Sequence, residues 1–155
     1  MLPFLDGERT PPLPDATGLL HGLTRRNTTP AHLVRAAVEG MLCGLADAVA
    51  PLASAGVVPR RIVLIGGAAR SEAVQRIAAG LFGLPVAVPE PAEYVALGAA
   101  KQAAWVLSQD TEPPPWQRDA AVVEPDPSTS AYFARVRSSY SSVLGAAQPL
   151  LTHRS

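Results

Sequence analysis

Residues Arg61–Ser71 read RIVLIGGAARS, and they predict a β-strand, a tight turn and the start of a helix. The unbroken aliphatic run Ile62–Ile65 is typical of a strand covered on both faces, so we expect it to lie in the interior of its sheet. Gly66 and Gly67 follow at once, and glycine permits positive φ and the close approach of another group. Ser71 is expected to cap the next helix by accepting a hydrogen bond from its first free N–H groups.

This strand, turn and helix start predict a contact with a nucleotide. Free backbone N–H groups and the positive end of a helix dipole together favour phosphate. The alternative is a plain connection between a strand and a helix, because two adjacent glycines are common in such turns. The turn alone leaves both interpretations open.

Composition limits the class of protein. At 155 residues, with 48% hydrophobic and 17% charged residues, the chain can form one domain with a sizeable core. Thirteen Lys and Arg balance thirteen Asp and Glu, which argues against nucleic acid or an anionic membrane as the main partner. No apolar run is long enough to span a bilayer and the first residues do not resemble a signal peptide, so we expect a cytoplasmic protein.

Metal chemistry is not indicated. The three histidines are scattered along the chain and the single cysteine, Cys43, can neither assemble a structural zinc site nor form an internal disulfide. Cys43 lies in a helical pattern and is expected to be a small buried residue. We therefore predict no metal site and no catalytic residue from these side chains.

Hydrophobic periodicity places the first long helix after Thr29, which is expected to cap it, with Pro30 at its first position and Gly56 as its stop. Gly40 and Gly44 inside this helix predict that another backbone passes close by, since each interior glycine costs about 1 kcal/mol relative to alanine. The expected buried stripe consists of residues spaced three and four apart: Leu33, Ala37, Met41, Leu45, Val49 and Leu52.

A second helix over 71–82, a strand over 84–88 and a third helix over 93–107 follow. Gly98 in the third helix predicts tight packing against a neighbour. The order of these elements predicts right-handed α/β units with a parallel pair of strands. Two or three strands make a thin sheet, so the chain is expected to be part of a larger domain whose earlier strands are missing.

Prolines divide the rest of the chain. They concentrate in residues 3–14 and 113–127, which predicts irregular structure there. We expect a main unit over 1–107, a proline-rich extended connector over 108–127, and a docking helix over 128–151.

A Rossmann-type dinucleotide site is a weaker interpretation of the same turn. Gly66, Ala68 and Ser71 stand where a G-x-G-x-x-G pattern requires three glycines, and Glu90 follows the next strand where a ribose-binding acid would lie. The acid fits this pattern and the glycines do not. Neither a G-x-S-x-G elbow nor a G-x-x-x-x-G-K-[ST] loop occurs in the chain.

Motifs along most of the chain point to one family. Residues 2–11 read LPFLDGERTP and are similar to a P-x-L-x-G-E-R-T-P stretch, and the Gly66–Ser71 turn, residues 83–86 and residues 93–100 follow in the family's order. A second signature is matched at Gly18, Leu20, Gly22 and Leu23 and then at His32, Leu33, Ala36, Ala37, Val38 and Glu39. Over residues 2–107 the chain resembles the C-terminal part of the FGGY family of carbohydrate kinases, most closely its xylulokinases.

This resemblance implies an α/β fold, namely a partial ribonuclease H-like (actin-like ATPase) C-terminal lobe with a short parallel sheet flanked by helices and its early strands missing. Two such lobes clamp MgATP and a sugar, so ATP or ADP with Mg²⁺ is the implied cofactor. Gly66, Gly67 and Ala68 would face ADP phosphate and ribose, and Ser71 would lie near the adenosine. Many members have a third glycine at the position of Ala68. Glu93 and the helix after it would support the pocket from behind.

The resemblance also implies what these 155 residues lack. The family's catalytic base is an aspartate of the preceding lobe, so this chain is expected to use sugar only with an N-terminal kinase half as its partner. Alone it is expected to be inactive, because phosphoryl transfer requires positioning and charge neutralisation from both sides. The alternative is a non-catalytic nucleotide-binding module or a degenerate remnant.

Overall fold

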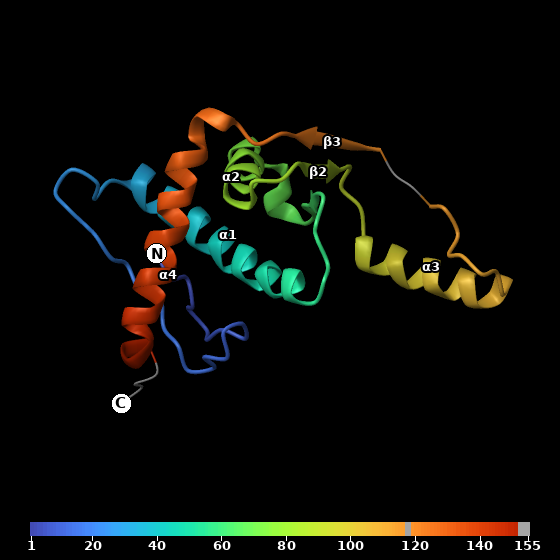
Figure 1. Cartoon of the computed structure of the whole chain (residues 1–155), viewed down its shortest axis with the longest axis horizontal. Coiled ribbons are helices and arrows are strands. Elements are labelled where there is room, and N and C mark those ends of the chain that lie inside the picture. The colour runs from blue at the N-terminus through green and yellow to red at the C-terminus, as the bar shows by residue number, and fades with distance from the viewer. Residues whose placement is uncertain (117–118, 152–155) are drawn as a thin grey trace.

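The computed structural model describes residues 1–116 and 119–151, and for residues 53 and 149–151 only the backbone. The helices and strands in chain order are α1 (Pro30–Ser54), β1 (Ile62–Val63), α2 (Glu72–Phe82), β2 (Val86–Pro89), α3 (Tyr94–Ser108), β3 (Ala120–Val123) and α4 (Ser130–Leu151). Two 3₁₀ turns, Gly67–Arg70 and Pro127–Thr129, precede α2 and α4. Figure 1 shows α1, α2 and α4 gathered in one body, and α3 extending away from it.

The sheet has three strands in the order β1-β2-β3. The expected parallel pair is present, with Ile62 opposite Val86. The third strand, β3, runs antiparallel to β2 and places Val123 opposite Val86, so the sheet is mixed rather than purely parallel. β3 lies inside the range 108–127 that was expected to be a connector. Four small residues after a proline-rich stretch form too short a run to predict a strand.

The expectation that the strand at Ile62–Ile65 lies inside its sheet is wrong for the described residues. β1 is two residues long and stands at one end of the sheet, while β2 occupies the middle. Val63 is 54% exposed and Ile65 48%. An aliphatic run indicates that both faces of a strand can be covered by other elements. It does not indicate which of these elements are present in the chain.

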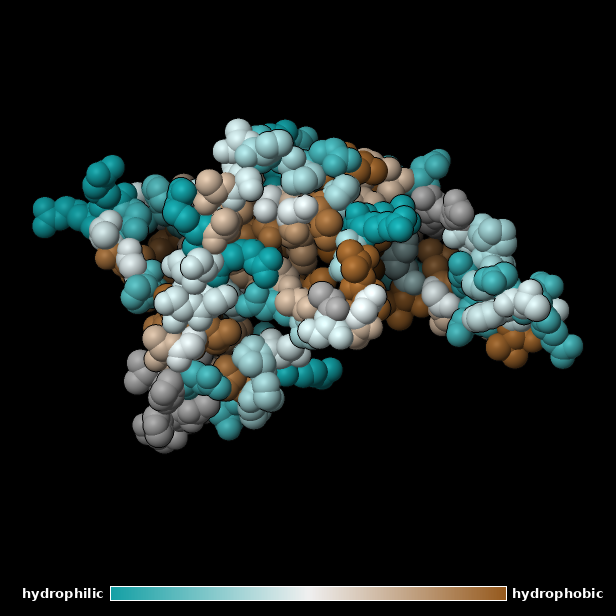
Figure 2. All heavy atoms as spheres, viewed as in Figure 1, coloured by the Kyte–Doolittle hydropathy of each residue, from teal (hydrophilic) through white to brown (hydrophobic). Residues whose placement is uncertain are grey.

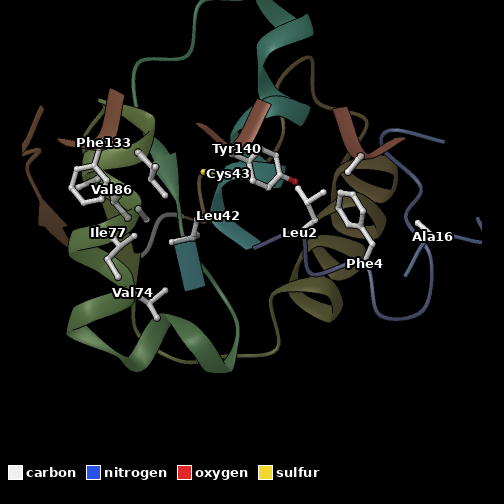
Figure 3. Packing of buried hydrophobic residues seen from close by; sticks show 14 of the residues in the cluster. Leu2, Phe4, Ala16, Leu42, Cys43, Val74, Ile77, Val86, Phe133 and Tyr140 are labelled. Atoms are coloured by element: carbon white, nitrogen blue, oxygen red, sulfur yellow. The ribbon is translucent and has the colours of Figure 1, made fainter. Parts of the chain in front are cut away.

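The core lies between α1, α2, α4 and the N-terminal segment. Figure 3 shows Phe133 and Ile77 at one end of it, Leu2 and Phe4 at the other, and Leu42 between them. The irregular first residues thus contribute to the core, and Leu2 is held by a pair of backbone hydrogen bonds to Leu19. The buried cluster comprises Leu2, Phe4, Leu13, Ala16, Leu42, Cys43, Val74, Ile77, Ala78, Ala79, Leu81, Val86, Phe133, Tyr140 and Ala147.

The helix α1 begins at Pro30 as predicted, after a Thr29 cap whose carbonyl accepts from Leu33. Gly40 confirms the expected close approach, because a Cβ there would lie 2.3 Å from the Met1 carbonyl oxygen. The buried face of α1 differs from the expected stripe. Leu42, Cys43 and Ala46 are buried, whereas Met41, Leu45 and Leu52 of the stripe are exposed. Periodicity defines an apolar stripe but does not determine which face meets the N-terminal segment and α4.

The helix α2 follows the prediction closely. It buries Val74, Ile77, Ala78 and Leu81, and it ends at Gly83, which adopts the left-handed conformation. Gly80 lies against α4, because a Cβ there would come within 2.1 Å of the Phe133 ring. This close approach joins two helices from the two ends of the chain.

The helix α3 has no buried residue, and a Cβ added at Gly98 would meet nothing within 4 Å. The tight packing predicted at Gly98 is therefore not formed among the described residues. None of the helices in residues 1–116 and 119–151 is long and apolar enough to cross a membrane.

Candidate functional site

The turn after β1 is built around an unusual backbone conformation at Gly66. Its φ of 94° and ψ of 179° lie in a region that glycine alone adopts readily. The 3₁₀ turn Gly67–Arg70 follows, and it separates β1 from α2 more than the expected tight turn would. The chain therefore leaves the strand in a wide bend whose outer side is exposed at Gly66, Gly67 and Ala68.

Ser71 occupies the N-cap position of α2, but its side chain makes no capping hydrogen bond, so the capping role predicted for its hydroxyl is wrong. Its backbone takes part instead: the Ser71 N–H donates to the Ala68 carbonyl at 3.1 Å, and its carbonyl accepts from Gln75 at 3.0 Å. The preceding 3₁₀ turn already orders the entry to the helix. The hydroxyl of Ser71 is left exposed at the start of α2.

Open space surrounds the two glycines of the turn. A Cβ built at Gly66 or at Gly67 would meet no atom of the described chain within 4 Å. Positive φ explains the glycine at 66. Gly67 has no positive φ and no neighbouring atom that would require a glycine. The space around it is therefore available to a group from outside the described chain.

The turn opens onto a cleft of about 680 Å³. Gly66 and Gly67 line one side, and the last residue of β2, Pro89, with the loop that follows it, Glu90 to Glu93, lines the other. Both segments follow the carboxyl ends of the parallel strands β1 and β2, where open α/β sheets bind their ligands. Ala121 of β3 completes the wall behind them.

Two hydrogen bonds fix the walls of this cleft. The Gln75 side chain donates to the Ala69 carbonyl at 2.7 Å and so ties the turn to the first coils of α2. On the other side, the Tyr94 hydroxyl donates to the carbonyl of Glu90 and closes the loop before α3. Sequence reasoning missed Gln75 and Tyr94, because a side chain that donates to a carbonyl six or four residues earlier leaves no hydrophobic period in the sequence.

Charges of both signs line the cleft. Arg70 lies on the side of the glycine turn, and Glu90 and Glu93 lie on the side of the β2 loop. A guanidinium suits phosphate, and carboxylates suit sugar hydroxyls or a hydrated divalent cation. Arg70 was not predicted as a site residue, because an arginine in the last turn of a short 3₁₀ helix carries no recognisable pattern.

The four residues predicted to contact a nucleotide are only partly brought together. Gly66 and Gly67 line the cleft, whereas Ala68 and Ser71 are exposed beside it and do not line it. Glu93, expected to support the pocket from behind, lines its wall directly. The nucleotide role of all four remains a prediction.

Residues 1–107 match the sequence profile of the "FGGY family of carbohydrate kinases, C-terminal domain". The chain belongs to the FGGY family of carbohydrate kinases. This confirms the resemblance drawn from the motifs at residues 2–11, 18–39 and 66–100. The match ends near the end of α3 and does not include β3 or α4.

Similar proteins agree on this FGGY assignment. The xylulose kinase of Streptomyces coelicolor is 50% identical over 109 residues, which are 70% of this chain and 22% of that protein. The crystal structure of xylulose kinase from Bifidobacterium adolescentis is 47% identical to this chain, with a TM-score of 0.68. The superposition covers 88% of this chain and 28% of the Bifidobacterium adolescentis chain. The ligand-bound xylulose kinase of Lactobacillus acidophilus is 28% identical to this chain, with a TM-score of 0.82. The superposition covers 95% of this chain and 31% of the Lactobacillus acidophilus chain.

This FGGY chain therefore spans about a fifth of the length of the Streptomyces coelicolor relative and less than a third of each of these two solved structures. It forms a small α/β unit with a three-stranded mixed sheet, and its structural neighbours are sugar kinases.

Proposed function

We propose that this chain supplies the nucleotide side of the cleft in a sugar kinase of the xylulose kinase type, which transfers the γ-phosphate of ATP to a sugar hydroxyl. The observation that carries the proposal is the open turn at Gly66 and Gly67, which lines a cleft at the carboxyl ends of two parallel strands. The similar xylulose kinases give the reaction class.

In this function Gly66, Gly67 and Ala68 face the phosphate and ribose of ADP, and Ser71 lies near the adenosine. Gly66 and Gly67 would do so from the lining of the cleft, and Ala68 and Ser71 from beside it. Arg70 adds positive charge on the same side of the cleft. Mg²⁺ in phosphoryl-transfer sites is held largely by substrate phosphates and one or two carboxylates. Glu90 and Glu93 on the opposite wall are the side chains of this cleft that could serve that ion.

The chain is proposed to be inactive alone. The general base that the family uses is expected in a preceding lobe, and the ribonuclease H-like sheet of this lobe is proposed to include earlier strands beyond β1. Positioning of the sugar and neutralisation of charge from the second side of the cleft would come from that part. The purified chain is therefore expected to show no sugar-dependent release of ADP in a coupled assay, whereas robust turnover would contradict the proposal.

Isothermal titration with ADP, adenosine and NAD tests the nucleotide role. ADP is expected to bind more tightly than adenosine, because the turn contacts phosphate, and more tightly than NAD. A preference for NAD would support a Rossmann-type unit, and no binding by any of the three would support a degenerate remnant.

Two glycine variants sharpen this titration. Gly67→Val is expected to abolish ADP binding without unfolding the protein, because no atom of the described chain lies within 4 Å of the added Cβ. Gly145→Val on α4 is the matched control, since its Cβ also meets nothing within 4 Å and it lies outside the cleft. Unchanged ADP affinity in Gly67→Val would remove the turn from the binding site.

A further inference from the structure

A cavity of about 290 Å³ lies between the helices α1 and α4 and the N-terminal segment. Its volume is at the lower end of the range for small-molecule sites, which is roughly 300–1,000 Å³. It shares no lining residue with the cleft at Gly66 and Gly67. A ligand of this cavity is therefore small, and it lies apart from the proposed place of the nucleotide.

The walls of this cavity are fixed relative to one another. Leu2 lines it from the N-terminal segment, and the N–H and C=O of Leu2 form paired hydrogen bonds with Leu19 at 2.8 and 2.9 Å. The same segment approaches α1 closely at Gly40. The hydrogen bond between Tyr132 and Glu39 joins α4 to α1 beside the cavity. The space is thus bounded by elements that the fold already holds in place.

The carboxylate of Glu39 lines this cavity, and the described residues use only one of its two oxygens. Oε1 accepts from the Tyr132 hydroxyl at 2.8 Å and from Nε of Arg35 at 2.5 Å. Oε2 accepts from no donor in residues 1–116 and 119–151, although Glu39 is only 8% exposed. Every side-chain oxygen of these residues that is sealed from open space has a partner, so Oε2 is open to the space beside it. A buried carboxylate oxygen favours a donor from a ligand there.

Tyr140 brings a second polar group to the same cavity. Its side chain is 7% exposed, and its hydroxyl makes no hydrogen bond within the described part of the chain. A buried tyrosine hydroxyl usually has a partner. Figure 3 shows this hydroxyl on the side of Leu2, which also lines the cavity. Tyr140 further lines a neighbouring cavity of about 590 Å³, so the phenol stands between the two spaces.

The charges around the cavity favour a ligand without net charge. The side chains that line it include one carboxylate, Glu39, and one guanidinium, Arg135. Arg35 already balances the charge of Glu39 at 2.5 Å, so an ammonium group would gain little there. Arg135 is exposed, so water and salt screen its attraction for an anion. A hydroxyl group both donates and accepts, and it therefore suits this wall better than either ion.

Apolar side chains supply another part of the wall. Leu2, Val136 and Val143 line the cavity together with the polar groups. Figure 2 shows a mostly pale or teal surface along α4 with hydrophobic patches beside it, so polar and apolar groups meet in this part of the molecule. A polyol matches both, because it has hydroxyl groups for the polar residues and a carbon chain for the apolar ones.

We propose that the cavity between α1 and α4 binds a small neutral polyol. One hydroxyl of the ligand donates to Oε2 of Glu39, a second contacts the hydroxyl of Tyr140, and the carbon chain lies against Val136 and Val143. The bound polyol connects α1 with α4 and so stabilises the folded protein. This proposal does not rest on the proposed function, because the two sites share no residue.

Nuclear magnetic resonance of the isotope-labelled chain with xylitol, a five-carbon polyol, tests this site. The amide signals of residues 36–43 and 135–143 are expected to shift and to saturate, while those of residues 66–71 stay in place. Putrescine, phosphate and L-serine serve as a cation, an anion and a zwitterion, and each is expected to bind at least tenfold more weakly than xylitol. Tighter binding of any of the three would overturn the choice of ligand. Shifts that do not saturate would show that water alone fills the cavity and would refute the site.

Two serine variants locate the ligand. Ser139→Leu is expected to weaken xylitol binding at least tenfold, because Ser139 lines the cavity and leucine would fill it. Ser138→Leu is the matched control, since both serines are exposed on α4 and Ser138 does not line the cavity. Equal affinity of the two variants for xylitol would contradict the proposed place of binding.

Thermal unfolding separates binding from the general effect of polyols, which stabilise folded proteins because they are excluded from the protein surface. Xylitol is expected to raise the unfolding midpoint of Ser138→Leu more than that of Ser139→Leu. Equal shifts would show exclusion alone and would count against the site. Loss of xylitol binding would leave the ADP titration unaffected, so the failure of this proposal can be told apart from the failure of the nucleotide function.

Discussion

The Tyr132 hydroxyl on α4 donates a hydrogen bond of 2.8 Å to Oε1 of Glu39 on α1, across 93 positions of the chain. The same oxygen accepts from Nε of Arg35 at 2.5 Å, and Glu39 is only 8% exposed. Burial and the hydrogen bond to Glu39 raise the pKa of the Tyr132 phenol. The buried carboxylate is thus satisfied by one group from its own helix and one from α4.

Tyr132→Phe is expected to lower the free energy of unfolding by about 1 kcal/mol, because it removes one hydrogen bond from a buried carboxylate. Urea unfolding followed by circular dichroism measures the change. In a Glu39→Ala background the same substitution is expected to have almost no effect, since the acceptor is gone. Equal losses in both backgrounds would show that the phenol stabilises the protein by packing alone.

Gly80→Ala is expected to destabilise the protein by about 1–3 kcal/mol, although alanine favours a helix. The new Cβ would lie 2.1 Å from the Phe133 ring, so α2 and α4 would have to separate. Gly145→Ala on α4, where a Cβ meets nothing within 4 Å, is expected to stabilise by up to about 1 kcal/mol. Thermal melts of the two variants should therefore shift in opposite directions.

Alkaline pH is expected to destabilise the protein through Cys43. Burial, with the nearby Asp47 carboxylate adding to it, raises the pKa of this thiol from 9.0 to about 11. Between these values the unfolded chain releases a proton that the folded chain keeps, so the free energy of unfolding falls as pH rises from 9 to 11, by up to about 2 kcal/mol.

Denaturant titrations at pH 8, 9, 10 and 11 measure this dependence. Cys43→Ala is expected to reduce the slope between pH 9 and 11. A remaining decline is expected between pH 10 and 12, because burial, reinforced by Asp47, raises the pKa of Tyr140 from 10.0 to about 12. An unchanged slope in Cys43→Ala would mean that the thiol ionises equally in both states.

A chain ending at residue 107 is expected to lose cooperative unfolding, although it keeps the whole region that matches the family. It would lack β3, which pairs with β2, and the core residues Phe133, Tyr140 and Ala147 of α4. Calorimetry should show no sharp transition, and a peptide of residues 108–155 added in trans should restore one. A sharp transition without the peptide would make the first 107 residues an independent folding unit.

Local signals in the sequence determined which elements could be predicted. Thr29 and Pro30 at the start of α1, and Gly83 at the end of α2, act through neighbouring backbone groups, so their positions were predicted from a few residues. The turn at Gly66 and Gly67 was found for the same reason.

Features that depend on distant partners were not predicted. The buried face of α1 depends on α4, and the place of β1 at the end of the sheet depends on which strands accompany it. In the candidate site, the hydrogen bonds of Gln75 and Tyr94 are local in the sequence, but they depend on the bend of the backbone before each residue, which no spacing rule predicts. The family motifs identified the side of the cleft, but only the fold showed that Ala68 and Ser71 stand outside its lining.

The bare edge of β1 also bears on how this protein behaves when it is overproduced. Arg60 and Arg61 stand directly before the strand, and charges beside an edge strand hinder its pairing with the strand of another molecule. Val63 and Ile65 are nevertheless about half exposed at this edge, so such pairing can still occur. We therefore expect that the overproduced chain, taken on its own, will appear largely in the insoluble fraction of a cell extract.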